Sequence, residues 1–206
     1  MNIGPTAILP HRMADGTELG FSLTPSEVLA VAYRCTELSL PEEVASSMER
    51  SALMLAERVE AGLTVYGLTS GVGDLRSESV DAYANVSAQQ NLVRSHACGV
   101  GPPLPQQVVR AAMALRAATL ARGWSGVRPD VCQQLVAMLA RGVHPVVPSS
   151  GSVGASGDTI PLAHIALVAT GEGRAWYDGH ELDGIAALEA AGLKPLRLEG
   201  REGLAL

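Results

Sequence analysis

The chain has 206 residues, of which 47% are hydrophobic and 17% are charged, so it has the composition of a globular protein with a buried core. Its 15 Lys and Arg against 21 Asp and Glu give a net charge of −6, which argues against a protein that binds nucleic acid through a basic face. The sequence contains no apolar run of the roughly 18 residues that a membrane span requires, and its N-terminus lacks the basic start of a signal peptide. We therefore expect a cytoplasmic protein.

The cysteines point to the same compartment. Cys35, Cys98 and Cys132 are odd in number and widely spaced, and they form no CxxC pattern. This spacing excludes a disulfide framework and a zinc site built from cysteines, and it fits a reducing cytosol. Because HExxH and similar motifs are also missing, we expect no metal.

Helix signals dominate the first two thirds of the chain. Thr24 to Glu27 forms a capping box before a helix that runs to about Arg34, and Ser39 to Glu42 repeats this pattern before a helix that stops at Gly62. Three further helices are expected over residues 81–95, 105–123 and 129–142. We expect each of the five helices to have proline at the front and glycine at the back.

Two stretches break the helical pattern. Residues 63–75 begin as a short β-type run and become a glycine-rich loop, and residues 148–158 are almost only Gly, Ser, Ala and Val. A helix over 159–170 follows. Residues 174–182 predict a β-hairpin on an Asp-Gly turn, residues 183–191 a short helix and residues 195–198 a short strand.

The segment GSVGASGD, residues 151–158, carries the strongest chemical signal. A flexible linker would not end at a helix start between two apolar helices. A P-loop would need a lysine, and the dinucleotide-binding glycine pattern needs a preceding strand where a helix is expected. The third interpretation is covalent: the amide nitrogen of Gly157 attacks the carbonyl carbon of Ala155, and loss of two waters leaves a five-membered ring with a methylidene group from Ser156. Small residues permit that approach.

GSVGASGDTIPLAH, residues 151–164, resembles the signature of the aromatic amino acid ammonia-lyase family, which includes histidine, phenylalanine and tyrosine ammonia-lyases and related aminomutases. Thr159-Ile160 stand where the family usually has Leu-Ala. The resemblance implies that Ala155, Ser156 and Gly157 form 4-methylidene-imidazol-5-one (MIO) autocatalytically. It also implies a mainly α, fumarase/aspartase-like fold, with an N-terminal α+β domain over about residues 1–145. Residues 146–206 would then hold the MIO loop, a helix and a hairpin, and lead into a central helical bundle.

A second segment supports the resemblance. YGLTSGVG, residues 66–73, is similar to the family loop YGVNTGFG, whose tyrosine removes the β-proton of the substrate. This implies that Tyr66 is the catalytic base and that Gly73 contacts the substrate. Thr69 and Val72 replace the common Asn and Phe. Taken alone, a tyrosine beside glycine would more often be a packing residue.

A third segment, residues 90–101, resembles the stretch that meets the substrate ring. Ser95-His96 matches the pair of histidine-selective members, whereas tyrosine-selective members carry His-Leu and phenylalanine-selective ones Phe-Leu. The match implies that Ser95 and His96 bind L-histidine, which would give trans-urocanate. A tyrosine ammonia-lyase or an aminomutase is the alternative. In isolation, His96 would be a helix-end histidine bonded to a backbone carbonyl. The remaining histidines, His11, His144, His164 and His180, are expected to be structural.

The resemblance extends over about residues 40–206, with further matches at Arg116 and at residues 123–127 and 202–206. Family members are much longer, and their later asparagine, carboxylate-binding arginine and second tyrosine find no counterpart here. We therefore expect the isolated chain to be inactive and to act in a homotetramer or with a complementing C-terminal chain. A non-catalytic assembly subunit or pseudoenzyme is the alternative from another class.

Overall fold

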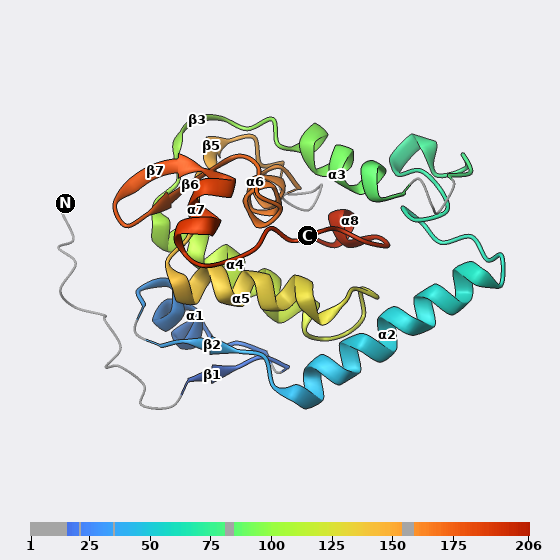
Figure 1. Cartoon of the computed structure of the whole chain (residues 1–206), viewed down its shortest axis with the longest axis horizontal. Coiled ribbons are helices and arrows are strands. Elements are labelled where there is room, and N and C mark those ends of the chain that lie inside the picture. The colour runs from blue at the N-terminus through green and yellow to red at the C-terminus, as the bar shows by residue number, and fades with distance from the viewer. Residues whose placement is uncertain (1–15, 21, 35, 81–84, 154–158) are drawn as a thin grey trace.

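The computed structural model describes residues 16–20, 22–34, 36–80, 85–153 and 159–206, without the side chains of residues 85 and 86. Most of these residues are helical, which confirms the mainly α fold (Figure 1). The helices are α1 (Pro25–Ala32), α2 (Glu42–Glu60), α3 (Asn85–His96), α4 (Gln106–Leu120), α5 (Pro129–Arg141), α6 (Thr159–Ala169), α7 (Gly184–Ala190) and α8 (Glu202–Ala205), with one 3₁₀ turn, η1 (Gly73–Leu75).

The strands are short and form three small sheets. Strands β1 (Thr17–Glu18) and β2 (Leu38–Ser39) pair in parallel, and β3 (Val100–Pro103) pairs antiparallel with β5 (Pro148–Ser150). The third sheet is antiparallel in the order β4-β6-β7, from β4 (His144–Pro145), β6 (Arg174–Tyr177) and β7 (His180–Asp183). The predicted hairpin is confirmed, because Asp178 and Gly179 join β6 to β7 with φ of 47° and 76°.

Helices α4 and α5 run side by side through the middle of the molecule (Figure 1). Helix α1 with β1 and β2 lies on one side of this pair, and α6, α7 and the sheet of β4, β6 and β7 lie on the other. Ala114 and Ala117 of α4 are fully buried, and they let the neighbouring helices approach closely. Larger buried side chains fill the remaining core, among them Met113, Leu120, Leu135, Met138 and Ile165.

A buried cation joins two of these helices at their C-terminal ends. Arg110 of α4 is only 4% exposed, and its guanidinium donates to the carbonyls of Val31 and Ala32 in α1 and of Leu139 in α5. Burial lowers the pKa of Arg110 to about 10, so the side chain remains charged at neutral pH. The negative ends of two helix dipoles therefore face one positive charge.

Several predicted boundaries are confirmed, and one capping prediction is wrong. Thr24 and Glu27 form the predicted capping box of α1. Gly142 closes α5 in the left-handed conformation. Ser39, by contrast, does not cap α2: it lies in β2, opposite Glu18, and Pro41 is the N-cap residue without a side-chain hydrogen bond. Strand pairing holds Ser39 in an extended conformation too early in the chain to cap the helix.

Two predicted strands are wrong for the same reason, since neither segment finds a partner strand. Residues 63–75 form turns, in which the backbone N–H of Val65 donates to the Thr69 hydroxyl at 2.8 Å, and Ser70 makes one isolated bridge with Ser79. Residues 195–198 have no regular structure, and Leu196 donates one backbone hydrogen bond to Ala169. The expected bracketing by proline and glycine is also wrong for two helices. Arg34, with a φ of 61°, follows α1 in place of a glycine, and no proline occurs in the ten residues before α3.

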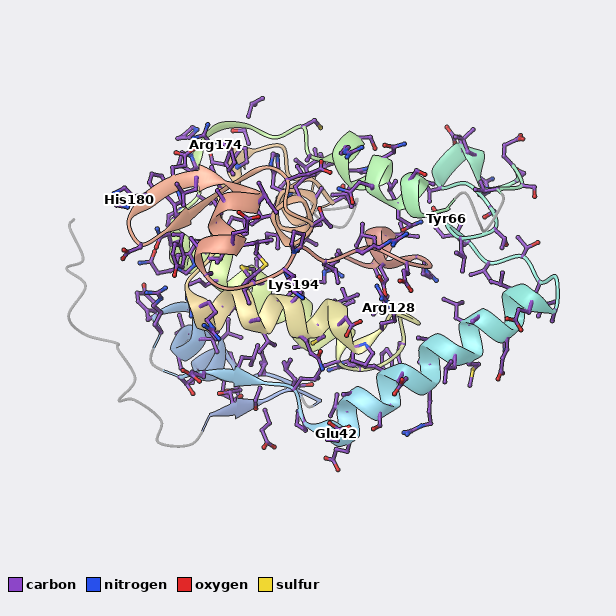
Figure 2. All side chains as sticks on the ribbon, in the orientation of Figure 1. Glu42, Tyr66, Arg128, Arg174, His180 and Lys194 are labelled. Carbon is purple, nitrogen blue, oxygen red and sulfur yellow. The ribbon has the colours of Figure 1, made fainter. Side chains whose placement is uncertain are left out.

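The element before the glycine-rich segment is a strand, not the expected helix. Strand β5 ends at Ser150, directly before Gly151, but it pairs antiparallel with β3 and belongs to no βαβ unit. The helix expected over 159–170 is confirmed as α6. Helix α2 extends away from the central pair, and the chain then turns back so that Tyr66 lies near α8 (Figures 1 and 2). None of the helices in the described ranges has both the length and the apolar character needed to cross a bilayer.

Candidate active site

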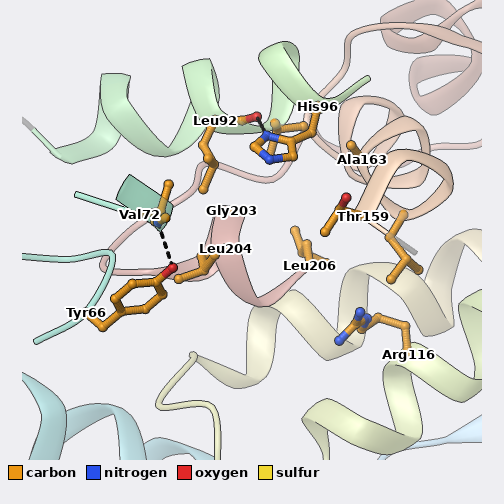
Figure 3. Close-up of a pocket in the computed structure, with 13 residues that line it drawn as sticks. Tyr66, Val72, Leu92, His96, Arg116, Thr159, Ala163, Gly203, Leu204 and Leu206 are labelled. Carbon is orange, nitrogen blue, oxygen red and sulfur yellow. Dashed lines mark hydrogen bonds between the residues drawn. The ribbon is translucent and has the colours of Figure 1, made fainter. Parts of the chain in front are cut away.

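We call the turns of residues 63–75 the Tyr66 turn. A cavity of about 590 Å³ opens between the Tyr66 turn, α3, α6 and the C-terminal residues (Figure 3). It brings together three of the residues predicted for the site, Tyr66, Gly73 and His96, which come from separate parts of the chain. Its other lining residues are Val72, Leu92, Val93, Arg116, Thr159, Leu162, Ala163, Gly203, Leu204 and Leu206. The wall is mostly apolar with a few converging polar groups, which is typical of a small-molecule site.

Tyr66 occupies one side of the cavity and is 46% exposed, so its phenol is accessible (Figure 3). The backbone N–H of Gly73 donates a hydrogen bond to the phenol oxygen at 3.0 Å. The turn that carries both residues is closed by Thr69, whose backbone N–H also donates to the Val65 carbonyl. The Gly73 amide thus fixes the position of the phenol oxygen at the edge of the cavity.

His96 is the last residue of α3 and lies across the cavity from Tyr66 (Figure 3). Its Nδ1 is 2.9 Å from the carbonyl oxygen of Leu92. A carbonyl only accepts, so this contact assigns the hydrogen to Nδ1 and leaves Nε2 of the neutral ring as an acceptor. His96 thus makes the backbone contact expected of a helix-end histidine and also lines the cavity.

Ser95 does not line the cavity. Its side chain is exposed, and its hydroxyl donates to the same Leu92 carbonyl at 2.8 Å. The Ser95 oxygen is also 3.2 Å from Nδ1 of His96. Any effect of Ser95 on a bound molecule therefore passes through the orientation of the His96 ring.

The predicted ring-forming residues Ala155, Ser156 and Gly157 lie outside the described residues. Helix α6 begins at Thr159, and Thr159, Leu162 and Ala163 of its first two turns line the cavity. The N-terminal end of α6 is therefore part of the wall.

Arg116 was noted as a family match but was not assigned to the site from sequence. It projects from α4 toward the cavity (Figure 3), and burial lowers its pKa below the ordinary arginine value. Among the described residues, no hydrogen bond or ion pair holds its guanidinium. The apolar wall of Leu92, Leu204 and Leu206 was also missed, because only the tertiary structure brings these leucines together.

The comparison with protein families agrees with this geometry. The aromatic amino acid lyase family matches residues 23–206, nearly the whole chain. The chain belongs to that family. This confirms the resemblance inferred from residues 151–164.

Individual relatives support the same assignment. Histidine ammonia-lyase of Gloeobacter violaceus is 50% identical over 187 residues, which are 91% of this chain and 36% of the relative. Among solved structures, the ergothioneine-degrading ergothionase of Treponema denticola has a TM-score of 0.89 at 31% identity, covering 93% of this chain and 38% of that one. Phenylalanine aminomutase of Pantoea agglomerans has a TM-score of 0.87 at 32% identity, and the match covers 93% of this chain and 37% of that one. The lyase-family chain thus spans little more than a third of the length of these relatives.

An ion pair with a buried carboxylate holds the C-terminal wall of the cavity. Glu202, at the start of α8, is 2% exposed and accepts hydrogen bonds from the backbone N–H, Nε and Nη2 of Arg128. The hydrogen bond with Glu202 is the main cause of a raised pKa of Arg128. Arg128 is the N-cap residue of α5. The pair therefore attaches α8, with Gly203 and Leu204, to the start of α5.

The other described histidines have structural contacts and do not line the cavity. His164 Nε2 accepts from the backbone N–H of Gly99 at 3.2 Å, and His180 Nδ1 donates to the Asp178 carbonyl. His144 is buried in β4, where its Nε2 accepts from Arg34. His11 lies outside the described residues. Within the described ranges, no group of three His, Cys, Asp or Glu residues has the arrangement of a metal site.

Proposed function

We propose that this lyase-family chain is part of an ammonia-lyase that converts L-histidine to trans-urocanate. The observation that carries the proposal is the cavity that joins Tyr66, Gly73 and His96 beside the start of α6. The 50% identity to a histidine ammonia-lyase supports this choice of substrate.

The proposal assigns MIO to Ala155, Ser156 and Gly157. The surroundings fit such a group, because the triplet directly precedes α6 and the first turns of α6 line the cavity. The free N–H groups at a helix N-terminus carry partial positive charge, which stabilises developing negative charge nearby. When formed, the group supplies an electrophile that withdraws electrons from the substrate.

Tyr66 acts as the general base that removes the β-proton. Its phenol is exposed to the cavity, and the Gly73 amide fixes the position of its oxygen. General base catalysis by one positioned side chain contributes about 10²–10⁴-fold to a rate. Gly73 contacts the substrate from the same turn.

His96 selects the ring of the substrate. With Nδ1 donating to Leu92, Nε2 accepts the N–H of an imidazole or the O–H of a phenol, and it has no such partner in a phenyl ring. Ser95 holds the same carbonyl and so restrains the His96 ring. Arg116 gives the cavity a positive potential that favours the substrate carboxylate.

The proposal can be tested by adding to this chain the C-terminal part that its longer relatives have. A chimera would join residues 1–206 to the remaining C-terminal part of the Gloeobacter violaceus enzyme, and its product would be measured with histidine, tyrosine and phenylalanine. We expect conversion of histidine to the unsaturated acid with release of ammonia. A folded chimera that eliminates ammonia from none of the three would overturn the proposal.

Mass spectrometry of the 206-residue chain tests the prosthetic group separately. Cyclisation lowers the intact mass by two water molecules, whereas Ser156→Ala, which lacks the leaving hydroxyl, cannot form the methylidene group. A mass equal to that of the uncyclised sequence would favour the non-catalytic assembly subunit. Product analysis also separates a lyase from an aminomutase, since a mutase returns a β-amino acid.

The proposal further includes a cytoplasmic homotetramer, or completion of the site by a C-terminal chain, and no activity for residues 1–206 alone. The division near residue 145 stays a prediction. Size-exclusion chromatography with light scattering would test the assembly.

A further inference from the structure

Gln89 of α3 bridges two segments that form the cavity wall. Its side chain is buried, with 3% of the residue exposed. Its Nε2 donates to the Gly67 carbonyl at 2.9 Å, and its Oε1 accepts from the Leu204 N–H at 3.0 Å. One amide thus ties the residue after Tyr66 to a residue that lines the cavity from α8.

The three segments are in close contact where the bridge forms. Gly67 has a φ of 69°, and a Cβ there would collide with the Leu204 side chain. A Cβ on Gly203 would lie 2.6 Å from the carbonyl oxygen of Gln89. Because the segments pack through glycines, they leave little room for water to replace the amide. Loss of the bridge would leave the buried carbonyl of Gly67 and the part-buried N–H of Leu204 without this partner.

Tyr66 itself depends on this anchor. Tyr66 is 46% exposed, and its phenol oxygen accepts a hydrogen bond from the Gly73 N–H of its own turn. Contacts inside the turn cannot fix the turn relative to His96 and α6. The bond from Gln89 to Gly67 does so, because Gln89 and His96 both belong to α3.

We infer that Gln89 is a positioning residue that holds the Tyr66 turn at its working distance from His96 and α6. The inference rests on the proposed role of Tyr66 as the base. Gln89 does not touch the substrate; it acts through Gly67 and Leu204. Its loss should therefore lower kcat, which depends on the placement of the base, more than it changes KM.

The neighbouring Gln90 provides a matched control. Gln90 opens the segment 90–101 but does not line the cavity. It is a half-buried amide of α3, and its Nε2 donates to Thr170 and Glu172. Gln89→Leu and Gln90→Leu remove the same chemical group from adjacent positions of one helix. A general effect on α3 would appear in both variants.

The experiment compares both variants in the active chimera. For Gln89→Leu we expect kcat to fall by about 100-fold, as for a displacement of a reacting group by about 1 Å, with KM changed by less than about threefold. For Gln90→Leu we expect kcat within about threefold of the unsubstituted chimera. The inference would be overturned if kcat fell equally in the two variants, or if kcat were unchanged in Gln89→Leu. If Gln89→Leu does not fold, Gln89→Glu keeps the shape and the acceptor for Leu204 but removes the donor to Gly67.

Hydrogen exchange in the 206-residue chain separates this inference from the proposed function. Gln89→Leu should speed exchange of the Leu204 amide at least about tenfold, and Gln90→Leu should not. An inactive unsubstituted chimera would count against the proposed function, whereas unchanged Leu204 exchange would count against the bridge.

Discussion

Glu202 accepts hydrogen bonds from Nε and Nη2 of Arg128, each at 2.8 Å, although the two residues are 74 positions apart. Bidentate contacts of this kind are directional as well as strong. The carboxylate is 2% exposed, whereas the Arg128 side chain is 30% exposed and also pairs with Glu199 and Asp130. The two partners are therefore buried to very different extents.

This asymmetry predicts unequal costs of removing either partner. Arg128→Met leaves a carboxylate buried without its cation and should lower the free energy of unfolding by about 3–5 kcal/mol. Glu202→Gln leaves a cation that still has two acidic neighbours and should cost less. Urea denaturation of the two variants measures the difference. If Glu202→Gln lowered the free energy of unfolding more than Arg128→Met did, burial of the carboxylate would not be what sets the cost of breaking this pair.

Tyr66→Phe should abolish most activity of the chimera without unfolding it. Removing the phenol oxygen removes the proposed base, so kcat should fall by about 10²-fold or more. Because the ring is half exposed, the free energy of unfolding should change by less than about 0.5 kcal/mol. Tyr33, similarly exposed at 48%, provides the control, and Tyr33→Phe should retain full activity. Retained activity in Tyr66→Phe would remove this residue from the mechanism.

His96→Phe should shift substrate preference toward phenylalanine. The substitution removes the Nε2 acceptor and adds an apolar ring, so kcat/KM for phenylalanine relative to histidine should rise by at least about tenfold. The measurement is competition between the two amino acids in the chimera. His180→Phe, on the exposed hairpin, should leave the ratio unchanged. A ratio that is also unchanged in His96→Phe would contradict the proposed contact with the substrate ring.

His144 should make stability depend on pH. Burial, and then the charges of Arg110 and Arg34, lower the pKa of His144 to about 4. The unfolded chain, with an ordinary histidine pKa of about 6.5, binds this proton more tightly than the folded chain. The stability contribution is therefore complete above about pH 6.5 and is lost as pH falls toward about 4, by about 3 kcal/mol.

The check is urea denaturation across this pH range for the unsubstituted chain and His144→Gln. Carboxylates such as Glu172, whose pKa is lowered mainly by its hydrogen bond with Arg94, titrate in both proteins and cancel in the difference. The variant should show a shallower fall between pH 6.5 and pH 4. Parallel curves would mean that His144 is not the group responsible.

The predictions from sequence succeeded where the determinants are local. The Thr24–Glu27 capping box, the start of α5 at Pro129 and the Asp178-Gly179 turn each depend on a few adjacent residues. The short β-type run expected at the start of residues 63–75 does not form, because a strand needs a partner strand and this segment pairs with none in the described residues.

The same distinction applies to the site. Tyr66 and His96 were identified through family motifs, and the structure places both on one cavity. Gln89 gave no such signal, since a glutamine within a helix is common on exposed surfaces and its two backbone partners are distant in sequence. Arg116 likewise became part of the site only because the tertiary structure brings α4 to the cavity.

The bond between Gln89 and Leu204 spans 115 residues, and this has a consequence for synthesis on the ribosome. Helix α3 and the Tyr66 turn leave the exit tunnel well before residues 202–206 exist. Until those residues emerge, Gln89 cannot bond to the Leu204 N–H, and Arg128 cannot pair with Glu202. The cavity is therefore among the last parts of this region to form in a nascent chain.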